Sequence, residues 1–396
     1  MKLSNRLDIL LYCHDGRGIG HAGRSVAIGM AVRRLFPACK VLLVTGSPYI
    51  ESLRAGSELD WLKLPGYETT VQNGISKGVD GKSNFPDKEL GTIRAQQLQD
   101  IINLYRPKLV LADHSPTGKH KELLPALQAS QQYSTSWFLG VRGIVGKVRQ
   151  VHSTLSRKTF AQYYRGLLWY GDSTILGSSH IHEVAHTFNT KVETAGYVSR
   201  MREIMALEGG EDHRKKIYAG TIALPWFDEH GFTLIRSLYQ ALSQLGSQYG
   251  KWVVFHPPVH SHHPFKRNLQ QLAELNNTTT RHFGAEYLPT LAQSRMAIIH
   301  GGYNSLTDVL YCQVPALVLL REMQDNEQQN HLELLTCNGQ ELLTPVHTSA
   351  FSGPFFAEKI HEMLTSPYRP PVIPVDLAGA EHAARYLVDT ISKNLQ

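Results

Sequence analysis

The chain contains 396 residues, of which 42% are hydrophobic, and its formal net charge is +6 with a pI near 9.0. This length allows two hydrophobic cores, so we expect two domains. Because Lys and Arg alternate with acidic residues along most of the chain, the charge argues against a nucleic-acid-binding stripe and leaves a mild attraction to anionic substrates or to a membrane surface.

No run of about 18 apolar residues indicates a transmembrane helix, and the N-terminal apolar stretch is too short for a signal peptide. The four cysteines, Cys13, Cys39, Cys312 and Cys337, are scattered without the spacing of a metal site. We therefore expect a cytoplasmic protein without disulfide bonds, in which any membrane contact is peripheral, at the inner face of the membrane.

The first predicted strand, residues 8–12, runs into a glycine-rich loop (HDGRGIGHAGR, residues 14–24) and a helix over residues 25–35. Gly18 and Gly20 let backbone N–H groups approach a ligand closely. The third glycine of a dinucleotide-binding loop and the acidic residue that ends its second strand are not clearly present, since Val44-Thr45-Gly46 follows the second strand. This departure argues against a nicotinamide-dependent dehydrogenase.

Within this loop, His21 stands at the start of the predicted helix. Held on a glycine loop, its imidazole can act as a general base; the alternative is a helix-capping or loop histidine. Arg24 follows one turn later and is grouped with Gly18 and Gly20 as an acceptor-side loop residue.

Residues 66–92 are polar and weakly periodic, which predicts a long loop. Such a loop near the ends of the early strands either contributes to acceptor binding or is a disordered solvent loop, and the sequence leaves both open.

Two further strand ends carry charged side chains. Asp113-His114 follows a predicted strand at residues 108–112, where Asp113 is an alternative base, an acceptor contact, or a carboxylate that caps the next turn. Arg142 follows a strand at residues 136–139 and either neutralises an anionic acceptor or departing phosphate, or forms an interdomain salt bridge.

Later predicted strands at residues 216–219, 252–255, 296–300 and 316–320 alternate with helical stretches, which predicts parallel sheets covered by helices. Residues 198–215 are charged and lack a strand signal, so they are the predicted interdomain linker. The predicted organisation is an N-terminal domain (1–197), a C-terminal domain (216–375) and a closing helix (376–396) that packs on the N-terminal domain.

Four histidines, His256, His260, His262 and His263, cluster in FHPPVHSHHP. The prolines and the expected loop conformation argue against preorganised metal ligation, so we expect no metal site and no cofactor. His256, just past a strand, is a weaker candidate for a donor contact.

The most informative segment is residues 298–330, IIHGGYNSLTDVLYCQVPALVLLREMQDNEQQN. A buried strand ends at His300, Gly301-Gly302 forms a tight turn, and Asn304 or Ser305 is expected to cap the next helix. The free N–H groups of such a helix start bind phosphate, although the same pattern is also an ordinary way to leave a strand.

Three side chains nearby can complete a nucleotide-sugar site. Asp308 lies about one turn into the helix, where its carboxylate can accept hydrogen bonds from ribose hydroxyls. Gln328 and Gln329, in the loop expected after the strand at residues 316–320, can address sugar hydroxyls.

The segments GRGIGHAGR and HGGYNSLTDVL resemble family 28 glycosyltransferases of the two-Rossmann, or GT-B, architecture. With LVLADHSPTGKHKELLPAL, FLGVRGIVG, LLWYGD and ETAGYVSR, the resemblance to a set of predicted bacterial glycosyltransferases extends over most of the chain. It implies an α/β fold with two Rossmann-like domains facing across a cleft. The C-terminal domain would hold a nucleotide-sugar donor, UDP-linked by resemblance only, and the N-terminal domain an acceptor.

The resemblance also implies roles for individual residues. Gly301-Gly302 and the Asn304-Ser305 helix start would bind the diphosphate, Asp308 would replace the usual glutamate at the ribose, and Phe283 to Leu288 would border the base. Gln328 and Gln329 match the paired glutamines near the donor sugar, and His21 matches the histidine of the first glycine loop. The loop after the first C-terminal strand, with Gly220 and Thr221, contains one glycine where a glycine-rich loop is expected.

The function implied is metal-independent inverting transfer of a sugar to an acceptor hydroxyl, with His21 as base. The acceptor is open: a sugar, a lipid-linked glycan or a small metabolite. Two alternatives use the same parts, a hydrolase with water as acceptor, which GxGHxxR also resembles, and a catalytically idle nucleotide-sugar binding protein. A sugar-nucleotide 2-epimerase shares the architecture but needs further acids and bases that the sequence does not identify.

Overall fold

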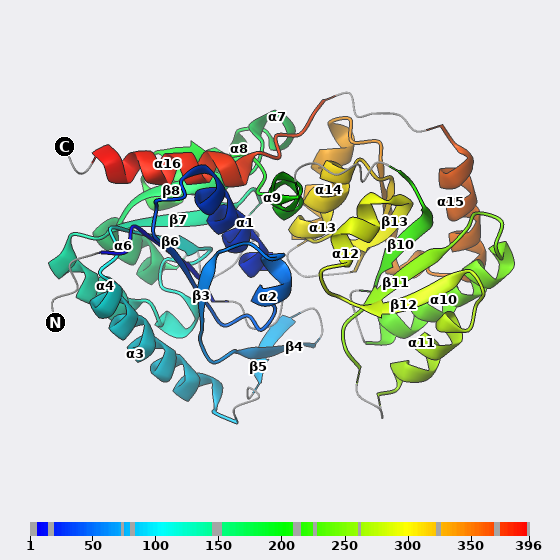
Figure 1. The fold of residues 1–396 in the computed structure, drawn as a ribbon, viewed down its shortest axis with the longest axis horizontal. Helices are drawn as coiled ribbons and strands as arrows, with labels where there is room; N and C mark the ends of the chain where they lie inside the picture. The colour runs from blue at the N-terminus through cyan, green and yellow to red at the C-terminus, as the bar shows by residue number, and fades with distance from the viewer. Residues whose placement is uncertain are drawn as a thin grey trace. The chain divides into compact units, whose positions relative to one another are not determined.

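The computed structural model describes residues 6–14, 20–72, 75–79, 84–144, 153–208, 215–224, 228–259, 263–321, 326–367 and 373–393, with only the backbone described at 69–72 and 75–79. The chain divides into two compact units. The N-terminal unit comprises Met1–Leu207 with Val375–Gln396, and the C-terminal unit comprises Glu208–Pro374. Each unit is an α/β layer structure, as the alternation of strands and helices in the sequence predicts (Figure 1).

The N-terminal unit is built on a parallel sheet with the strand order β3-β2-β1-β6-β7-β8-β9. Its strands are β1 (Ile9–Cys13), β2 (Val41–Thr45), β3 (Asp60–Lys63), β6 (Leu109–Asp113), β7 (Ser136–Arg142), β8 (Tyr164–Tyr170) and β9 (Val192–Thr194). Strands β1, β2 and β6 are fully buried apolar runs, as expected for a sheet covered on both faces.

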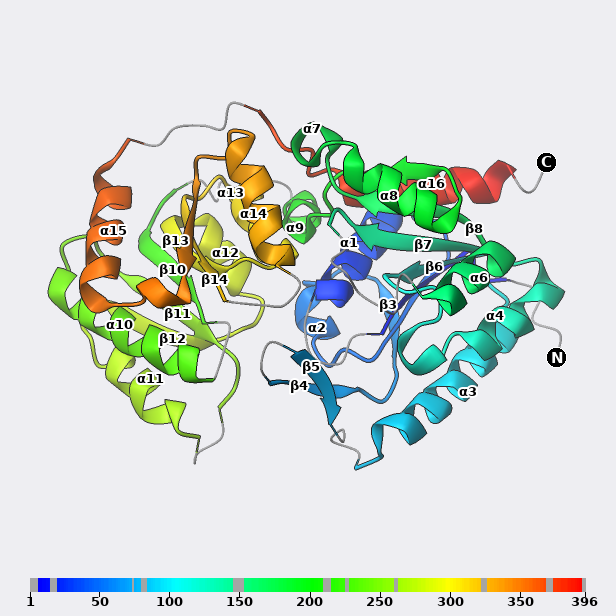
Figure 2. The same ribbon diagram turned by 180° about the vertical axis from the view of Figure 1, so that it is seen from behind.

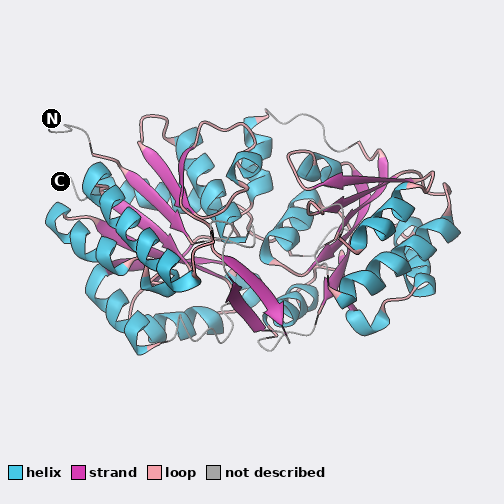
Figure 3. Cartoon of the chain, turned by 90° about the horizontal axis from the view of Figure 1, so that it is seen from below, coloured by secondary structure: helices cyan, strands magenta, loops and turns pink. Residues whose placement is uncertain are grey.

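Helices cover both faces of this sheet (Figure 3). They are α1 (Gly20–Leu35), α2 (Ile50–Leu53), α3 (Asp87–Tyr105), α4 (Leu124–Ser130), α6 (Thr154–Tyr163), α7 (Ser173–Leu176), α8 (Ser179–Phe188), α9 (Arg200–Leu207) and α16 (Gly379–Lys393), with short 3-10 turns η1 (Lys119–Lys121) and η2 (Gln131–Tyr133). Helix α16 returns to this unit from the end of the chain and lies along α1 (Figure 1). This is the position predicted for the closing helix.

Residues 198–215, predicted as a linker, include helix α9 of the N-terminal unit. Met201 and Ile204 of α9 are buried, and the buried carboxylate of Glu203 accepts hydrogen bonds from Arg34 of α1 at 3.0 and 3.1 Å. The prediction is therefore wrong for α9, because the charge that suggested a solvated linker instead pairs with a neighbouring helix.

Residues 66–92, predicted as a loop, contain an antiparallel pair, β4 (Glu68–Gln72) and β5 (Ile75–Val79). Helix α3 then begins within the same stretch, at Asp87. The loop prediction is wrong for these elements, because hydrogen bonding between two short polar strands leaves little hydrophobic periodicity in the sequence.

The C-terminal unit has a second parallel sheet, in the order β12-β11-β10-β13-β14-β15. Its strands are β10 (Tyr218–Ala223), β11 (Trp252–His256), β12 (Thr278–His282), β13 (Ser294–His300), β14 (Ala316–Leu320) and β15 (Leu343–His347). Its helices are α10 (Glu229–Leu245), α11 (Phe265–Ala273), α12 (Tyr287–Ala292), α13 (Tyr303–Cys312), α14 (Glu327–Cys337) and α15 (Gly353–Thr365), with the 3-10 turn η3 (Thr348–Ala350).

Two helix layers sandwich this second sheet. Helices α10, α11 and α15 gather on one face, while α12, α13 and α14 cover the other (Figures 1 and 2). A buried apolar cluster joins β10, β11, β13 and β14 to α10, α11 and α15. No helix of the described residues is long and apolar enough to cross a membrane.

Both sheets reverse their strand order once, and this locates the ligand-binding edge of each unit. In the N-terminal sheet β1 lies between β2 and β6, and in the C-terminal sheet β10 lies between β11 and β13. Chain connections leave such a switch point in opposite directions, so a crevice opens at the carboxyl ends of the strands. A ligand site is therefore expected among the residues that follow β1, β6, β10 and β13.

Candidate functional site

In the C-terminal unit, the segment after β13 forms an open helix start. Gly302 is the N-cap of α13, with φ −75° and ψ 146°, and no side chain of the described residues caps it. Asn304 and Ser305 lie inside the first turn, so the prediction that either of them is the N-cap is wrong. An uncapped helix start presents backbone N–H groups and the positive end of the helix dipole, which is an anion-binding arrangement.

The two glycines of this turn are closely packed against neighbouring side chains. A Cβ added to Gly302 would lie 2.6 Å from Nε2 of His300, and one added to Gly301 would lie 2.8 Å from Cδ2 of Leu320 and 3.5 Å from Cβ of Gln328. His300 is further held by Ser305, whose Oγ lies 3.3 Å from its Nδ1. Burial lowers the pKa of His300 to about 4, so this imidazole is neutral at physiological pH.

The other predicted donor residues on this edge lie in helices. Asp308 is on the second turn of α13 and is 5% exposed. Gln328 and Gln329 lie in the first turn of α14 rather than in a loop, and Gln329 donates a hydrogen bond to Glu333 at 2.9 Å. Gln328 therefore reaches the Gly301 turn, while Gln329 is turned along its own helix.

Three predicted donor residues are part of the packed interior instead. Gly220 and Thr221 lie inside β10, where an added Cβ on Gly220 would be 2.3 Å from the Trp252 ring and Thr221 shares a 2.7 Å hydrogen bond with Ser294. Leu288 is 2% exposed in α12. The loop expected at Gly220 and Thr221 is wrong, because strand β10 runs through this segment; the donor roles of these three buried residues stay predictions.

Phe283 is the one exposed member of a small aromatic group beside β12. Its ring centroid lies 5.4 Å from that of Tyr287 and 6.0 Å from that of Phe255, and the residue is 37% exposed. It follows the edge strand β12. A partly exposed aromatic ring held by two others can stack on a flat ligand.

In the N-terminal unit, the structure joins His21 to Asp113 across the switch point. His21 lies in the first turn of α1, which follows β1, and Asp113 is the last residue of the adjacent strand β6. Nδ1 of His21 lies 2.5 Å from Oδ2 of Asp113, which is 3% exposed. A carboxylate at that nitrogen fixes the imidazole as the Nδ1–H tautomer and leaves Nε2 as the basic nitrogen.

Arg24 contacts the same carboxylate. Its guanidinium lies 2.8 Å from Oδ2 of Asp113, and the residue is 2% exposed. Burial alone would raise the pKa of Asp113, but the charge of Arg24 and the contact with His21 outweigh burial and hold that pKa well below its usual range. Asp113 is therefore an ionised partner of His21, and Arg24 lies in the interior beside it; the base role of Asp113 and the acceptor-side role of Arg24 stay predictions.

Two more histidines complete the cluster. The ring centroid of His21 lies 4.7 Å from that of His14, which follows β1, and 5.0 Å from that of His114, which follows β6. Burial lowers the pKa of His14 and of His114 well below the usual value, and the neighbouring His21 lowers both further. Both are neutral, and the Nδ1 atom of each is buried without a hydrogen-bond partner in the described structure.

His114 is held in a strained position. Its φ of 74° lies in the left-handed region, which side chains rarely adopt, and its N–H donates to the carbonyl of Gly140 at 2.7 Å. Gly140 cannot carry a side chain, because a Cβ there would lie 2.0 Å from the Tyr170 hydroxyl. Arg142 ends β7 and is close enough to His114 for its charge to lower the pKa of that histidine.

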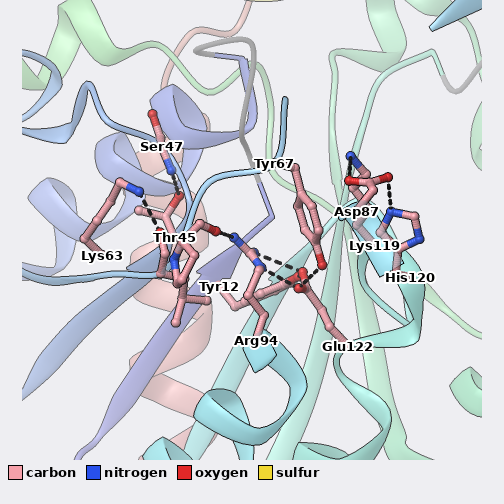
Figure 4. A network of polar contacts seen from close by, with 12 residues as sticks. Tyr12, Thr45, Ser47, Lys63, Tyr67, Asp87, Arg94, Lys119, His120 and Glu122 are labelled. Carbon is pink, nitrogen blue, oxygen red and sulfur yellow. Dashed lines mark hydrogen bonds and ion pairs between the residues drawn. The ribbon is translucent and has the colours of Figure 1, made fainter. Parts of the chain in front are cut away.

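A buried polar network anchors the segment that follows His114 (Figure 4). Glu122 accepts hydrogen bonds from Arg94 at 2.5 and 3.0 Å, from Tyr67 at 2.7 Å and from Tyr12. Arg94 and Glu122 are fully buried. Because Tyr12 belongs to β1 and Glu122 follows the β6 turn, the network fixes the loop at 114–122 against the strand that leads to His21.

The remaining predicted positions add no metal site. His256 ends β11, where its ring lies 4.8 Å from that of His282 and its Nδ1 lies 2.7 Å from the Pro257 carbonyl oxygen. His260, His262 and Gly18 lie outside the described residues. Within the ranges that are described, no group of three or more His, Cys, Asp or Glu side chains is arranged to hold a metal ion.

Comparison with solved structures identifies the architecture. Over 98% of this chain, MurG from Acinetobacter baumannii superposes with a TM-score of 0.53 at 12% identity, matched over 100% of its own length. The UDP-GlcNAc 2-epimerase from Neisseria meningitidis bound to UDP-GlcNAc matches with 0.60 at 15% identity, over 98% of this chain and 99% of that one. UGT71G1 from Medicago truncatula, complexed with UDP-glucose, matches with 0.60 at 11%, over 98% of both chains.

The C-terminal unit also matches a family in sequence: residues 231–367 match the glycosyltransferase family 28 C-terminal domain. The chain has the GT-B architecture, and the family match is confined to residues 231–367. No curated protein matches it in sequence. The matched segment includes the Gly301-Gly302 turn, α13 and the start of α14, so it covers the predicted donor residues that the structure brings together.

Sequence reasoning missed His14 and the role of Arg24 in this GT-B protein. A signal for both exists, since His14 directly follows a predicted strand and Arg24 lies three residues after His21 on one helix face. The order of the strands, which places β1 beside β6, is the information that the sequence lacks.

Proposed function

We propose that the protein is a nucleotide-sugar-dependent glycosyltransferase in which the C-terminal unit binds the donor and the N-terminal unit activates the acceptor. The observation that carries this proposal is the family 28 match of residues 231–367, within which the Gly301-Gly302 turn leads into the start of α13, where no described side chain caps Gly302. The His21–Asp113 contact at the switch point of the other sheet supports the acceptor half.

The donor half of the proposal rests on charge. The two phosphates of a nucleotide diphosphate sugar are anionic, and negative charge develops on them as the glycosidic bond breaks. The N–H groups at the start of α13 and the dipole of that helix stabilise this charge without reorganisation. Asp308 accepts hydrogen bonds from the ribose, Gln328 contacts the sugar, and Phe283 stacks on the base.

In the acceptor half, His21 removes the proton of the acceptor hydroxyl through Nε2, because Nδ1 is occupied by Asp113. The hydroxyl oxygen forms a bond to the anomeric carbon as the bond from that carbon to the diphosphate oxygen breaks. The electron pair of the broken bond leaves with the diphosphate, and the proton ends on the imidazolium, which the Asp113 carboxylate stabilises. One in-line displacement inverts the anomeric configuration, and no covalent intermediate is involved.

A UDP-linked donor is supported by the similar structures that hold UDP-GlcNAc and UDP-glucose. Those structures belong to an epimerase and to UGT71G1, at 15% and 11% identity, so the shared feature is the fold and the choice of reaction is this proposal. A hydrolase in which His21 activates water is the second candidate, because the same His21–Asp113 pair serves either oxygen nucleophile.

A panel of nucleotide diphosphate sugars tests the proposal. We expect titration calorimetry to detect specific binding of a UDP-sugar to the full chain, and nucleotide release to occur only when a cell extract supplies an acceptor. Release in buffer alone would establish the hydrolase instead. Conversion of the bound sugar to its 2-epimer would establish an epimerase, and absence of binding across the panel would overturn the donor site.

A further inference from the structure

Arg24 occupies an interior position that the proposed reaction does not require. It lies on the same helix face as His21, three residues later on α1, and 98% of its surface is buried. One guanidinium nitrogen lies 2.8 Å from Oδ2 of Asp113 and 2.9 Å from Nδ1 of His21. Arg24, His21 and Asp113 thus converge on a single carboxylate oxygen.

The 2.9 Å contact with His21 raises the question of whether Nδ1 of His21 carries a proton. Nδ1 either accepts from Arg24 or donates to Asp113, and it cannot do both. The contact with Oδ2 is shorter, at 2.5 Å, and a bare nitrogen lone pair facing an ionised carboxylate at that distance would be repelled. Nδ1 therefore carries the proton, and Arg24 acts on Asp113.

The charges of the three groups make one protonation state of His21 favourable. Arg24 already supplies the cation that the buried Asp113 carboxylate needs, so these three side chains together carry no net charge while His21 is neutral, and Arg142 adds a positive charge beside His114. A second proton on His21 would leave a net positive charge in a largely buried group, beside the neutral rings of His14 and His114. Without Arg24, the same proton would neutralise Asp113 and become favourable.

We propose that Arg24 is a positioning residue that holds Asp113 in contact with His21 and, by supplying the counter-charge, keeps His21 singly protonated and available as a base. This inference rests on the proposed function for its catalytic consequence, but the state of His21 is a property of the free protein. Arg24 is assigned no contact with the acceptor or the donor, and its effect on the reaction passes through Asp113 and His21.

The test compares Arg24→Gln, which keeps a hydrogen-bond donor but removes the charge, with Arg24→Lys, which keeps the charge. Arg33→Met is the matched control, because Arg33 lies on the same helix and pairs with the exposed Glu58. Nitrogen-15 NMR of the histidine rings in the full chain, with His21 assigned by its loss in His21→Gln, reports which ring nitrogens carry protons at each pH. The pH profile of kcat is measured in parallel.

In R24Q we expect the nitrogen-15 signals of His21 to report a proton on Nε2 as well as on Nδ1 at neutral pH, because Asp113 has lost its counter-charge, whereas R24K and R33M should keep the wild-type signals. The kcat at neutral pH should fall in R24Q and stay at the wild-type level in R24K and R33M. An unmoved His21 signal in folded R24Q would overturn the inference. A changed His21 signal with an unchanged kcat would leave Arg24 as the residue that sets the proton state of His21 and would contradict His21 as the base.

The wild type gives a second measurement that holds even where R24Q fails to fold. At neutral pH its His21 should show one proton, on Nδ1, with Nε2 unprotonated. Protons on both ring nitrogens at that pH would show that Asp113 captures the imidazolium despite Arg24, and would overturn the inference.

Discussion

Replacement of Asp113 by Asn would test the buried charge cluster on which the N-terminal site depends. The substitution keeps the shape of the side chain but removes the charge that Arg24 pairs with at 2.8 Å, and Arg24 and Asp113 are 2% and 3% exposed. Removing one member of a buried ion pair costs about 3–5 kcal/mol, because the other charge is left uncompensated. For a unit of this size, that loss lowers the Tm by roughly 6–20 °C.

The pH dependence supplies the sign of the effect. The pKa of Asp113 in the folded protein lies below its ordinary value, so the carboxylate stabilises the fold at every pH above about 4. This contribution is lost as the pH falls from there toward the folded value. We therefore expect the difference between wild type and D113N to be complete at neutral pH and to shrink progressively below pH 4.

The assay is differential scanning calorimetry of the full chain, in which the transition of the N-terminal unit should shift and that of the C-terminal unit should not. Glu58→Gln is the matched control, because Glu58 is 88% exposed in its pair with Arg33 and exposed pairs contribute about 0–1 kcal/mol. A loss below about 1 kcal/mol in D113N, or a loss that does not depend on pH, would refute the account of a buried charge cluster.

Two further substitutions examine other parts of the chain. In Gly302→Ala the added Cβ would lie 2.6 Å from Nε2 of His300, so the His300 ring or the turn must move. Calorimetry should show UDP-sugar affinity at least tenfold lower, about 1.4 kcal/mol. An affinity within twofold of wild type would contradict a role of this turn in donor binding. In Glu122→Gln the fully buried Arg94 loses its counter-charge, so the Tm of the N-terminal unit should fall as in D113N. An unchanged Tm would show that the hydrogen bonds of Tyr12 and Tyr67 are enough to hold the loop at residues 114–122.

Much of the fold follows from local sequence signals. Buried strands such as β1, β2 and β14 are continuous apolar runs that end at glycine or polar residues, and these were predicted to within one or two residues. Strand β8 was missed, because Tyr164–Tyr170 follows a helix directly, without a turn signal between them. Helix α9 was missed because its charged residues are typical of a solvent-exposed linker.

In the candidate site too, contiguous motifs could be predicted from the sequence and contacts between distant residues could not. The donor turn is contiguous in sequence, so His300, the two glycines and α13 could be predicted as one motif. The error at Gly220 arose because a single glycine inside a strand looks like a loop until Trp252 is seen packed over it. The His21–Asp113 contact joins residues 92 positions apart and depends on β1 lying beside β6, which no local pattern encodes.

The central claim is that donor binding and acceptor activation reside in different units. The measurement that tests it most directly is a paired determination of UDP-sugar Kd and turnover in His21→Ala and in Asp308→Ala. We predict that H21A keeps the wild-type Kd and loses turnover, by at least about 100-fold. D308A should weaken donor binding first. Equal loss of both properties in both variants, or full turnover in H21A, would contradict this division of labour.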